Sequence, residues 1–389
     1  MTGPQQLRKN GNMLDLVRRE VIDTANTVVI KIGSQVLARA DDTLDTTRIA
    51  HIAEQIHRIR STGRRVILVS SGAVAAGFGL LDFGQRPASL PRLQAAAAAG
   101  QPHLIRHYDD CLRSHGYYAA QILLTADDFN SRERYLNMRF TLSTLLDQGA
   151  IPIVNENDTI STDEIKFGDN DRLASMVANL QERTLLIILS NVDGLYSGSP
   201  DSEQSQLIPL VESWDDTLLN YAATSGTKRG TGGMLTKLQA ARDATAVGEN
   251  VIIANGTRAN VLQDILDGRP TGTLFLAQGG VMPAWKRWIG YTREPQGRFI
   301  LDDGAHRAVG QAGKSLLAIG VSAVEGDFAK GGVVSLSSST GTDFARGLSN
   351  YDSRDSRLIA GKGTQQIESI LGSVPYIEMV HRDNLVLTV

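Results

Sequence analysis

Three glycines and a lysine lie close together in the stretch RGTGGMLTK, residues 229–237. The backbone N–H groups of such a turn can bind a phosphate, and Lys237 can add a positive charge at the same place. The stretch does not match the common phosphate-binding motifs. It lacks the GxxxxGK[ST] spacing of a P-loop, and Leu235 occupies the position of the third glycine of a GxGxxG motif. The pattern therefore indicates phosphate binding without a P-loop.

A second lysine, Lys31, lies inside the apolar run TVVIKIG, residues 27–33. A buried ammonium group needs an anionic partner, because its desolvation costs on the order of several kcal/mol. A structural salt bridge and a phosphate ligand both satisfy this need. Gly33 favours the phosphate, since a glycine lets an anion approach the backbone. Ser71 and Gly72 end another apolar run and open a helix, which indicates either a helix N-cap or an anion-binding helix start.

The segment NENDTISTDEIKFGDND, residues 155–171, is rich in aspartate, glutamate and asparagine but contains only one lysine. A solvated loop is the usual explanation for such a run. However, residues 155–158 continue a predicted buried strand, and Asp169, Asn170 and Asp171 open a helix. Helix capping accounts for one of these three side chains. The others suit a ligand that carries an ammonium group, or a group that organises the lysines.

These polar stretches must be positioned by the apolar runs around them. Runs rich in β-branched residues alternate with segments of helical spacing. The predicted strands are residues 27–33, 64–72, 118–125, 150–158, 184–191 and 250–256. The predicted helices are residues 49–63, about 91–116, 132–149 and 237–248. Because the strands are apolar on both faces, we expect an α/β fold with a mostly parallel sheet between helices. Ligands bind such sheets at the carboxyl ends of the strands, where the polar stretches fall.

The composition changes twice along the chain. Residues 1–25 are polar and of mixed charge, which predicts a weakly ordered extension. Residues 26–292 contain the alternating strands and helices. Residues 293–389 consist of short runs broken by glycine, serine and aspartate, which predicts a small β-rich domain. We place the boundary in YTREPQG, residues 291–297.

The bulk composition excludes several classes of protein. A net charge of −3 gives no general attraction to nucleic acid or to anionic membranes. The single cysteine, Cys111, excludes an internal disulfide framework and suits a reducing cytosol, where we interpret it as an inert packing thiol. We see no signal peptide and no apolar run as long as a membrane span. A cytoplasmic protein that does not contact membranes is therefore expected.

Taken together, two lysines, two glycine turns and an acidic cluster at one end of one sheet predict a phosphoryl-transfer cleft. The stretches VVIKIGSQVL, VSSGAVAAG, AIPIVNENDTI, KFGDND, LSNVDGLYS and RGTGGMLTKLQAA occur in this order. In that order they resemble the glutamate 5-kinases of the amino acid kinase family, and the resemblance extends from about residue 26 over nearly the whole chain. The tail, from GRFILDDGA to IESILG, resembles the PUA domain that many of these bacterial kinases carry.

This resemblance implies ATP-dependent phosphorylation of the γ-carboxylate of L-glutamate, the first step of proline biosynthesis, with Mg²⁺ accompanying ATP. It implies that Ser71, Asp158 and Asn170 hold glutamate, while Asp171 orients the two lysines. The positions implied to contact ATP are Lys31, Ser190, Asn191, Thr231, Gly232, Gly233, Met234, Leu235, Thr236 and Lys237. The family often has Thr-Asp where this chain has Ser190-Asn191, which puts a charged or metal-linked role there in doubt.

The resemblance also implies a homo-oligomer (dimer or tetramer), feedback inhibition by proline and handover of the product to a downstream reductase. The glutamate side chain has a pKa of about 4.3 and is already ionised at neutral pH, so we assign no general base. In this interpretation Lys237 makes no core contact.

Two other interpretations compete with this one. Another amino acid kinase, such as acetylglutamate kinase, acts on an acylated nitrogen and needs no carboxylate for a free ammonium group, so Asp158 and Asp169 argue against it. An RNA-binding protein acting through the PUA domain would rely on lysine and arginine. Residues 294–375 contain eight Lys/Arg against nine Asp/Glu and show no aromatic stacking cluster, so RNA binding is not expected.

Overall fold

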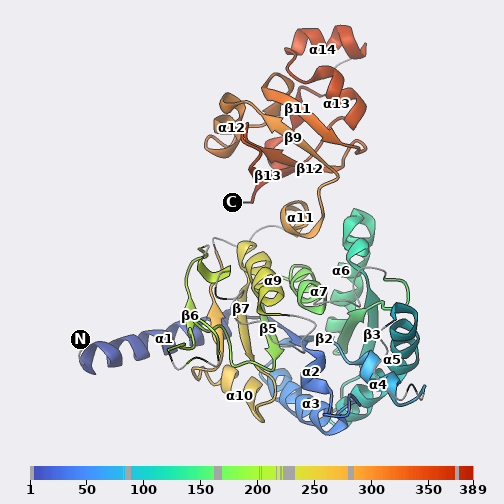
Figure 1. Ribbon diagram of the computed structural model, residues 1–389, viewed down its shortest axis with the longest axis vertical. Helices are drawn as coiled ribbons and strands as arrows, with labels where there is room; N and C mark the ends of the chain where they lie inside the picture. Colours follow the sequence, from blue (N-terminus) through green and yellow to red (C-terminus); the bar gives the residue numbers. More distant parts are fainter. Residues whose placement is uncertain are drawn as a thin grey trace. The chain divides into compact units, whose positions relative to one another are not determined.

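The computed structural model describes residues 4–81, 83, 89–161, 169–200, 202, 204–215, 217–219, 221, 233–278, 284–372 and 376–388. The chain forms two compact units (Figure 1). The first comprises Met1–Asp128 and Arg132–Val281, and the second comprises Phe129–Ser131 and Met282–Val389.

The first unit is built on a sheet whose eight described strands run in the order β3-β4-β2-β1-β5-β7-β8-β6. All neighbouring strands are parallel except β7 and β8, which are antiparallel. The strands are β1 Thr27–Ile32, β2 Arg65–Ser70, β3 Ala119–Leu124, β4 Ile151–Glu156, β5 Thr184–Ser190, β6 Leu210–Val211, β7 Asn250–Asn255 and β8 Thr273–Phe275. The predicted mostly parallel sheet between helices is confirmed.

Helices cover both faces of this sheet. The helices of the first unit are α1 Pro4–Thr24, α2 Ser34–Leu37, α3 Thr46–Ser61, α4 Ala73–Phe78, α5 Leu90–Arg113, α6 Arg132–Asp147, α7 Asp169–Ala178, α9 Met234–Ala246 and α10 Val261–Leu266. The short helix η1, Ala126–Asn130, begins in the first unit and ends in the second. Helices α7 and α9 pack against each other on one side, while α3 packs with α5 and α10 on the other (Figure 1). No helix in the described part of the chain is both long and apolar enough to cross a membrane.

The N-terminal segment differs from the predicted weakly ordered extension, because it forms helix α1. Val21 and Ile22 at the end of this helix belong to the hydrophobic core. Arg18 is only 1% exposed and its guanidinium donates hydrogen bonds to the carbonyls of Thr271 and Gly272, both at 2.9 Å. A polar composition predicts solvent exposure. An arginine can nevertheless be buried when its guanidinium donates hydrogen bonds to several backbone carbonyls.

The second unit is β-rich, as predicted. Its larger sheet has the strand order β11-β9-β12-β13-β15, and β10 pairs separately with β14. Its elements are α11 Ala284–Arg287, η2 Trp288–Thr292, β9 Gly297–Leu301, α12 Asp303–Gly310, β10 Leu316–Leu317, η3 Ala318–Gly320, β11 Val321–Gly326, β12 Val333–Ser337, β13 Asp343–Leu348, α13 Ser353–Ile359, α14 Thr364–Leu371, β14 Glu378–Val380, η4 Arg382–Asn384 and β15 Leu385–Leu387. The Trp288 indole donates to the carbonyl of Phe129 at 2.8 Å, and both residues belong to this unit.

Helices α4 and α5 approach each other unusually closely. A Cβ atom at Gly100 would lie 1.9 Å from the carbonyl oxygen of Ala73 and 2.3 Å from the backbone nitrogen of Gly77. Only glycine fits such an approach. Helix α5 is thereby held directly against the segment that follows β2, which brings its next residue, Gln101, toward the carboxyl end of the sheet.

We expect Gly100→Ala to lower the free energy of unfolding by about 1–3 kcal/mol or more, because the added methyl group must push two helix backbones apart. Gly79→Ala is the matched control. Gly79 has an αR backbone, and a Cβ there meets no atom within 4 Å, so its stability should stay unchanged or rise slightly. Urea unfolding of both variants measures the difference, and equal stabilities would contradict the tight contact.

Candidate active site

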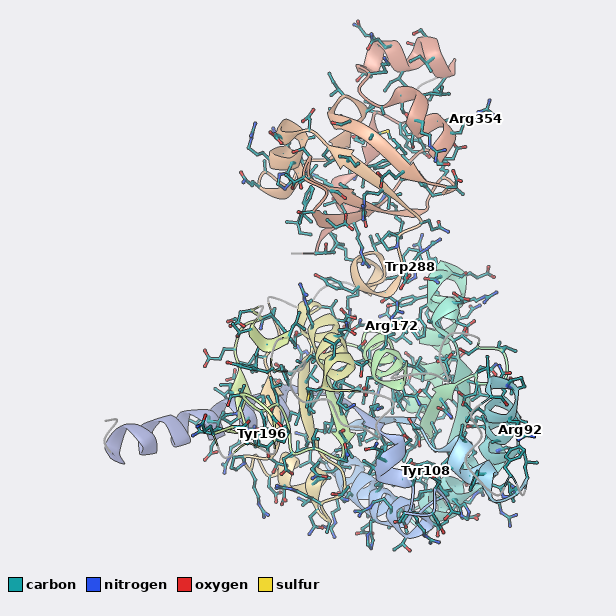
Figure 2. All side chains as sticks on the ribbon, in the orientation of Figure 1. Arg92, Tyr108, Arg172, Tyr196, Trp288 and Arg354 are labelled. Atoms are coloured by element: carbon teal, nitrogen blue, oxygen red, sulfur yellow. The ribbon has the colours of Figure 1, made fainter. Side chains whose placement is uncertain are left out.

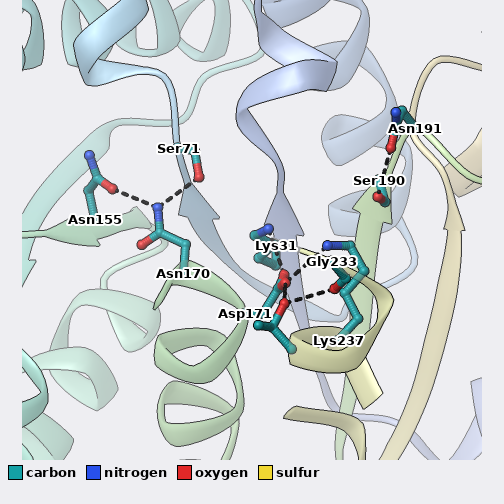
Figure 3. A network of polar contacts seen from close by, with 10 residues as sticks. Lys31, Ser71, Asn155, Asn170, Asp171, Ser190, Asn191, Gly233 and Lys237 are labelled. Atoms are coloured by element: carbon teal, nitrogen blue, oxygen red, sulfur yellow. Dashed lines mark hydrogen bonds and ion pairs between the residues drawn. The ribbon is translucent and has the colours of Figure 1, made fainter. Parts of the chain in front are cut away.

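Two lysines from distant parts of the chain meet one buried aspartate. Lys31 lies on the central strand β1, and its Nζ is 2.6 Å from Oδ1 of Asp171 in the first turn of α7. Lys237 in the first turn of α9 places its Nζ 3.1 Å from Oδ2 of the same carboxylate (Figure 3). Lys31 is 6% exposed, Asp171 is 0% exposed and Lys237 is 4% exposed. They form one buried ionic unit, which we call the Lys–Asp–Lys unit.

The charges of the Lys–Asp–Lys unit shift one another's pKa values. Burial alone would raise the pKa of Asp171, but the ammonium groups of Lys31 and Lys237 outweigh burial and hold that pKa below its ordinary value. Burial lowers the pKa of Lys237; Lys31 acts in the same direction and Asp171 opposes it. Asp171 is therefore ionised at neutral pH, with one negative charge facing two amino groups.

A glycine follows the strand that carries Lys31. Gly33 follows β1, and its N–H donates to the carbonyl of Leu189 on β5 at 3.1 Å. A Cβ atom at Gly33 would lie 3.3 Å from that carbonyl oxygen and 3.6 Å from the Lys31 ammonium. Because Gly33 has no side chain, no Cβ atom crowds the Leu189 carbonyl or the Lys31 ammonium at the carboxyl end of the central strand. This is where an open parallel sheet binds its ligands.

The glycine-rich stretch is described from Gly233 onward, whereas Thr231 and Gly232 lie outside the described residues. Gly233 is the N-cap of α9, so the turn leads directly into that helix. The hydroxyl of Thr236 lies 3.1 Å from Oδ2 of Asp171 and 2.9 Å from the carbonyl oxygen of Gly233, which share its one proton. The start of α9 is thus hydrogen-bonded to the Lys–Asp–Lys unit. The expectation that Lys237 makes no core contact is wrong, because its side chain is buried.

A separate group of polar side chains lies at the ends of β2 and β4. The amide nitrogen of Asn170 donates to the Ser71 hydroxyl at 2.8 Å and to Oδ1 of Asn155 at 3.1 Å (Figure 3). The amide nitrogen of Asn155 donates in turn to Oε1 of Gln101 on α5 at 2.9 Å. Asn170 and Asp171 are consecutive in α7, so this network adjoins the Lys–Asp–Lys unit. Gln101 was not predicted as a site residue, because α5 contains other polar side chains, such as Gln94, and the sequence does not show which of them faces the strand ends.

Helix α5 also contacts the carboxyl end of β2 through a buried tyrosine. Tyr108 is fully buried in α5 (Figure 2), and its hydroxyl lies 2.9 Å from the Ser70 hydroxyl. Burial raises the pKa of Tyr108, so the phenol is neutral and can take part in this hydrogen bond. The N–H of Ser71 donates to the carbonyl of Ile32 at 3.1 Å. These contacts position the Ser71 hydroxyl that Asn170 uses.

The other predicted site residues in the described part of the chain follow the ends of β5 and β4. Ser190 ends β5, and its hydroxyl donates to Oδ1 of Asn191 at 3.3 Å (Figure 3). Asp158 is half-buried in the turn after β4. Among the described side chains, no group of three or more His, Cys, Asp or Glu residues could hold a metal ion.

Family models match both parts of the chain. The amino acid kinase family model matches residues 26–255, and the PUA domain model matches residues 297–371. A glutamate 5-kinase from Methylococcus capsulatus is 45% identical over 371 residues, covering 95% of this chain and 99% of the relative. A glutamate 5-kinase from Geobacter sulfurreducens is also 45% identical, covering 95% of this chain and 100% of the relative.

A carbamate kinase from Giardia lamblia bound to AMP-PNP is 18% identical with a TM-score of 0.47, covering 65% of this chain and 99% of that chain. That likeness is too distant to refine the assignment. The family model, in contrast, covers more than half of the chain, and the sequence relatives match it almost from end to end. The chain therefore belongs to the amino acid kinase family, and within that family it groups with the glutamate 5-kinases.

Proposed function

We propose that this protein transfers the γ-phosphoryl group of ATP to the γ-carboxylate of L-glutamate, forming glutamyl 5-phosphate for proline biosynthesis. The single observation that carries the proposal is the buried Lys–Asp–Lys unit beside a polar amide network at the carboxyl end of the sheet. The glutamate 5-kinases that share nearly the whole sequence support the same assignment.

The lysines address the main electrostatic difficulty of this reaction. ATP and the glutamate carboxylate are both anions, so positive charge must offset their repulsion and stabilise the transferring phosphoryl group. Lys31 and Lys237 supply that charge from two different elements, and Asp171 holds both ammonium groups in place. The acceptor carboxylate is already ionised at neutral pH, with a pKa of about 4.3, so the reaction needs no general base.

The amide network is suited to the amino-acid substrate. Ser71 accepts a hydrogen bond from Asn170, which leaves its hydroxyl proton available for a ligand carboxylate. Asn170 places its side chain one residue from Asp171, so a ligand held there reaches the lysines. In the proposal Asp158 balances the α-ammonium of glutamate from the turn after β4.

The nucleotide is proposed to contact Lys31, the segment 231–237, Ser190 and Asn191. Asn191 contributes hydrogen bonds but no charge there. Mg²⁺ is proposed to bind through the ATP oxygens, because Asp171 is already paired with two lysines. When bound in this way, Mg²⁺ neutralises phosphate charge. A dimer or tetramer, inhibition by proline and delivery to a reductase rest on family resemblance alone.

The proposal is tested with ATP, Mg²⁺ and hydroxylamine, which converts acyl phosphates into hydroxamates. We expect rapid hydroxamate formation with L-glutamate and kcat/KM at least about 10²-fold lower with N-acetyl-L-glutamate, because the acylated nitrogen carries no charge and adds bulk in a site built for a small ammonium group. Lys237→Met protein, purified by the same procedure, controls for activity from a contaminating kinase. Equal or faster turnover of N-acetylglutamate would overturn the substrate assignment.

A further inference from the structure

The amide network has a direction. Asn170 donates to Asn155 at 3.1 Å, and Asn155 donates to Gln101 at 2.9 Å, so the three side chains form a chain of donors and acceptors that starts at Asn170. Two buried atoms at its ends have no hydrogen-bond partner among the described residues. These are the amide nitrogen of Gln101 and the carbonyl oxygen Oδ1 of Asn170.

A primary amide donates only through nitrogen and accepts only through oxygen, so the chain has two consistent polarities. If Gln101 presents its oxygen to Asn155, Asn155 presents its own oxygen to Asn170, and Asn170 keeps Oδ1 free. If Gln101 presents its nitrogen instead, both asparagines must turn over, and Asn170 then presents its NH₂ group. The Ser71 hydroxyl accepts or donates equally well and fixes neither state.

We propose that Gln101 is a positioning residue that determines substrate specificity by setting this polarity. With Gln101 as the acceptor, Asn170 directs Oδ1 toward the substrate, where it accepts a hydrogen bond from the α-ammonium of an amino acid. This inference rests on the proposed function and extends it to a residue outside the predicted site. A dicarboxylate without the ammonium group leaves the buried oxygen unpaired and is rejected for that reason.

The placement of Gln101 suits such a role. It is 7% exposed and follows Gly100, whose backbone is pressed against α4. It belongs to α5, whereas the asparagines belong to β4 and α7, so it acts on Asn170 only through Asn155. Among the described side chains, its hydrogen bond is to Asn155 and not to the Lys–Asp–Lys unit. Its substitution should therefore alter recognition of the amino acid and leave ATP binding unchanged.

Two substitutions separate this role from simple packing. Gln101→Glu is isosteric and can only accept hydrogen bonds, so it locks the polarity described here. Gln101→Met preserves length and packing but removes the acceptor. If Gln101 only fills space, Gln101→Met should resemble the wild type, and Gln101→Glu should lose activity because it buries a carboxylate. The polarity role predicts the opposite order.

The experiment measures hydroxamate formation from L-glutamate and from glutarate, the analogue without the α-ammonium. We expect Gln101→Met to raise KM for glutamate by about 10-fold or more, the effect of one lost hydrogen bond to a charged group, with KM for ATP unchanged. Its preference for glutamate over glutarate in kcat/KM should fall by a similar factor. Gln101→Glu should keep both quantities within about threefold of the wild type.

The preference ratio is independent of how much of a variant is folded, so it remains informative if one variant is unstable. An unchanged ratio in Gln101→Met, or a ratio reduced equally in both variants, would refute the polarity role. If the wild-type protein converts glutamate normally, that result leaves the proposed function intact. If the wild type forms no hydroxamate from glutamate, the proposed function fails and this inference fails with it.

Discussion

Replacing Lys237 by methionine is expected to lower kcat for glutamate phosphorylation by about 10²–10³-fold, the usual effect of removing one preorganised electrostatic contact. The Lys237 ammonium lies 3.1 Å from Asp171, in the first turn of α9, where it faces the same carboxylate as Lys31. Methionine fills much of the same volume without the charge. The loss should therefore appear in kcat more than in KM for glutamate.

The effect of Lys237→Met on stability should be small, although the lysine is buried. The Lys–Asp–Lys unit sets two amino groups against one carboxylate, so the variant retains a balanced pair of Lys31 and Asp171 at 2.6 Å. It also removes an ammonium group whose burial lowers its pKa. We expect the free energy of unfolding to change by no more than about 1 kcal/mol, since no buried charge is left alone.

Arg242→Met is the matched control for this experiment, because it removes one positive charge from an exposed position on the same helix. Its kcat should stay within about twofold of the wild type, since an exposed charge outside the site is screened. Steady-state kinetics and urea unfolding are measured for both variants. A folded Lys237→Met enzyme with near-normal kcat would contradict the proposed role, and a large stability loss with normal kinetics would identify Lys237 as a structural residue.

The strands that carry the site were predictable because each is short, apolar and β-branched and ends in a polar or glycine residue. The structure places β1 at Thr27–Ile32 and β5 at Thr184–Ser190, within a residue or two of the predicted limits. Strand β8, Thr273–Phe275, was missed because three residues give no period to detect. Strand β3 is only half-buried because it lies at the edge of the sheet, which a run of apolar letters does not reveal.

The site itself was only partly predictable from the sequence. Motifs located its pieces at strand ends, but local spacing could not show that Lys31 and Lys237 share one carboxylate, because they are far apart in sequence. That arrangement came from the family resemblance. Gln101 was missed because the pattern of an alanine-rich helix says nothing about what lies across from it. The burial of Lys237 was misjudged for a related reason, since α9 packs on α7 and the lysine is enclosed between elements distant in sequence.

Removing the carboxylate of the Lys–Asp–Lys unit, instead of one of its lysines, should lower the stability of the fold strongly. Asp171→Asn keeps the shape of the side chain but leaves Lys31 and Lys237 without their shared carboxylate in a buried site. We expect a loss of about 3–5 kcal/mol in the free energy of unfolding at pH 7, the usual range when a buried charge loses its partner. Asp147→Asn is the control, because Asp147 forms an exposed ion pair with Arg65 at 2.5 Å and should cost at most about 1 kcal/mol.

The pH dependence of this loss follows from the pKa of Asp171, which the two lysines hold below its ordinary value of 3.8 even though burial acts to raise it. The unfolded chain therefore takes up this proton at a higher pH than the folded chain. The stabilisation is complete above pH 3.8 and is lost as the pH falls below that value. Urea unfolding at pH 7, 5 and about 3.5 should thus show a constant gap between wild type and Asp171→Asn at the two higher values and a smaller gap at the lowest. A gap at pH 7 no larger than that of Asp147→Asn would mean that the carboxylate does not stabilise the two lysines, and the electrostatic account of the site would then fail.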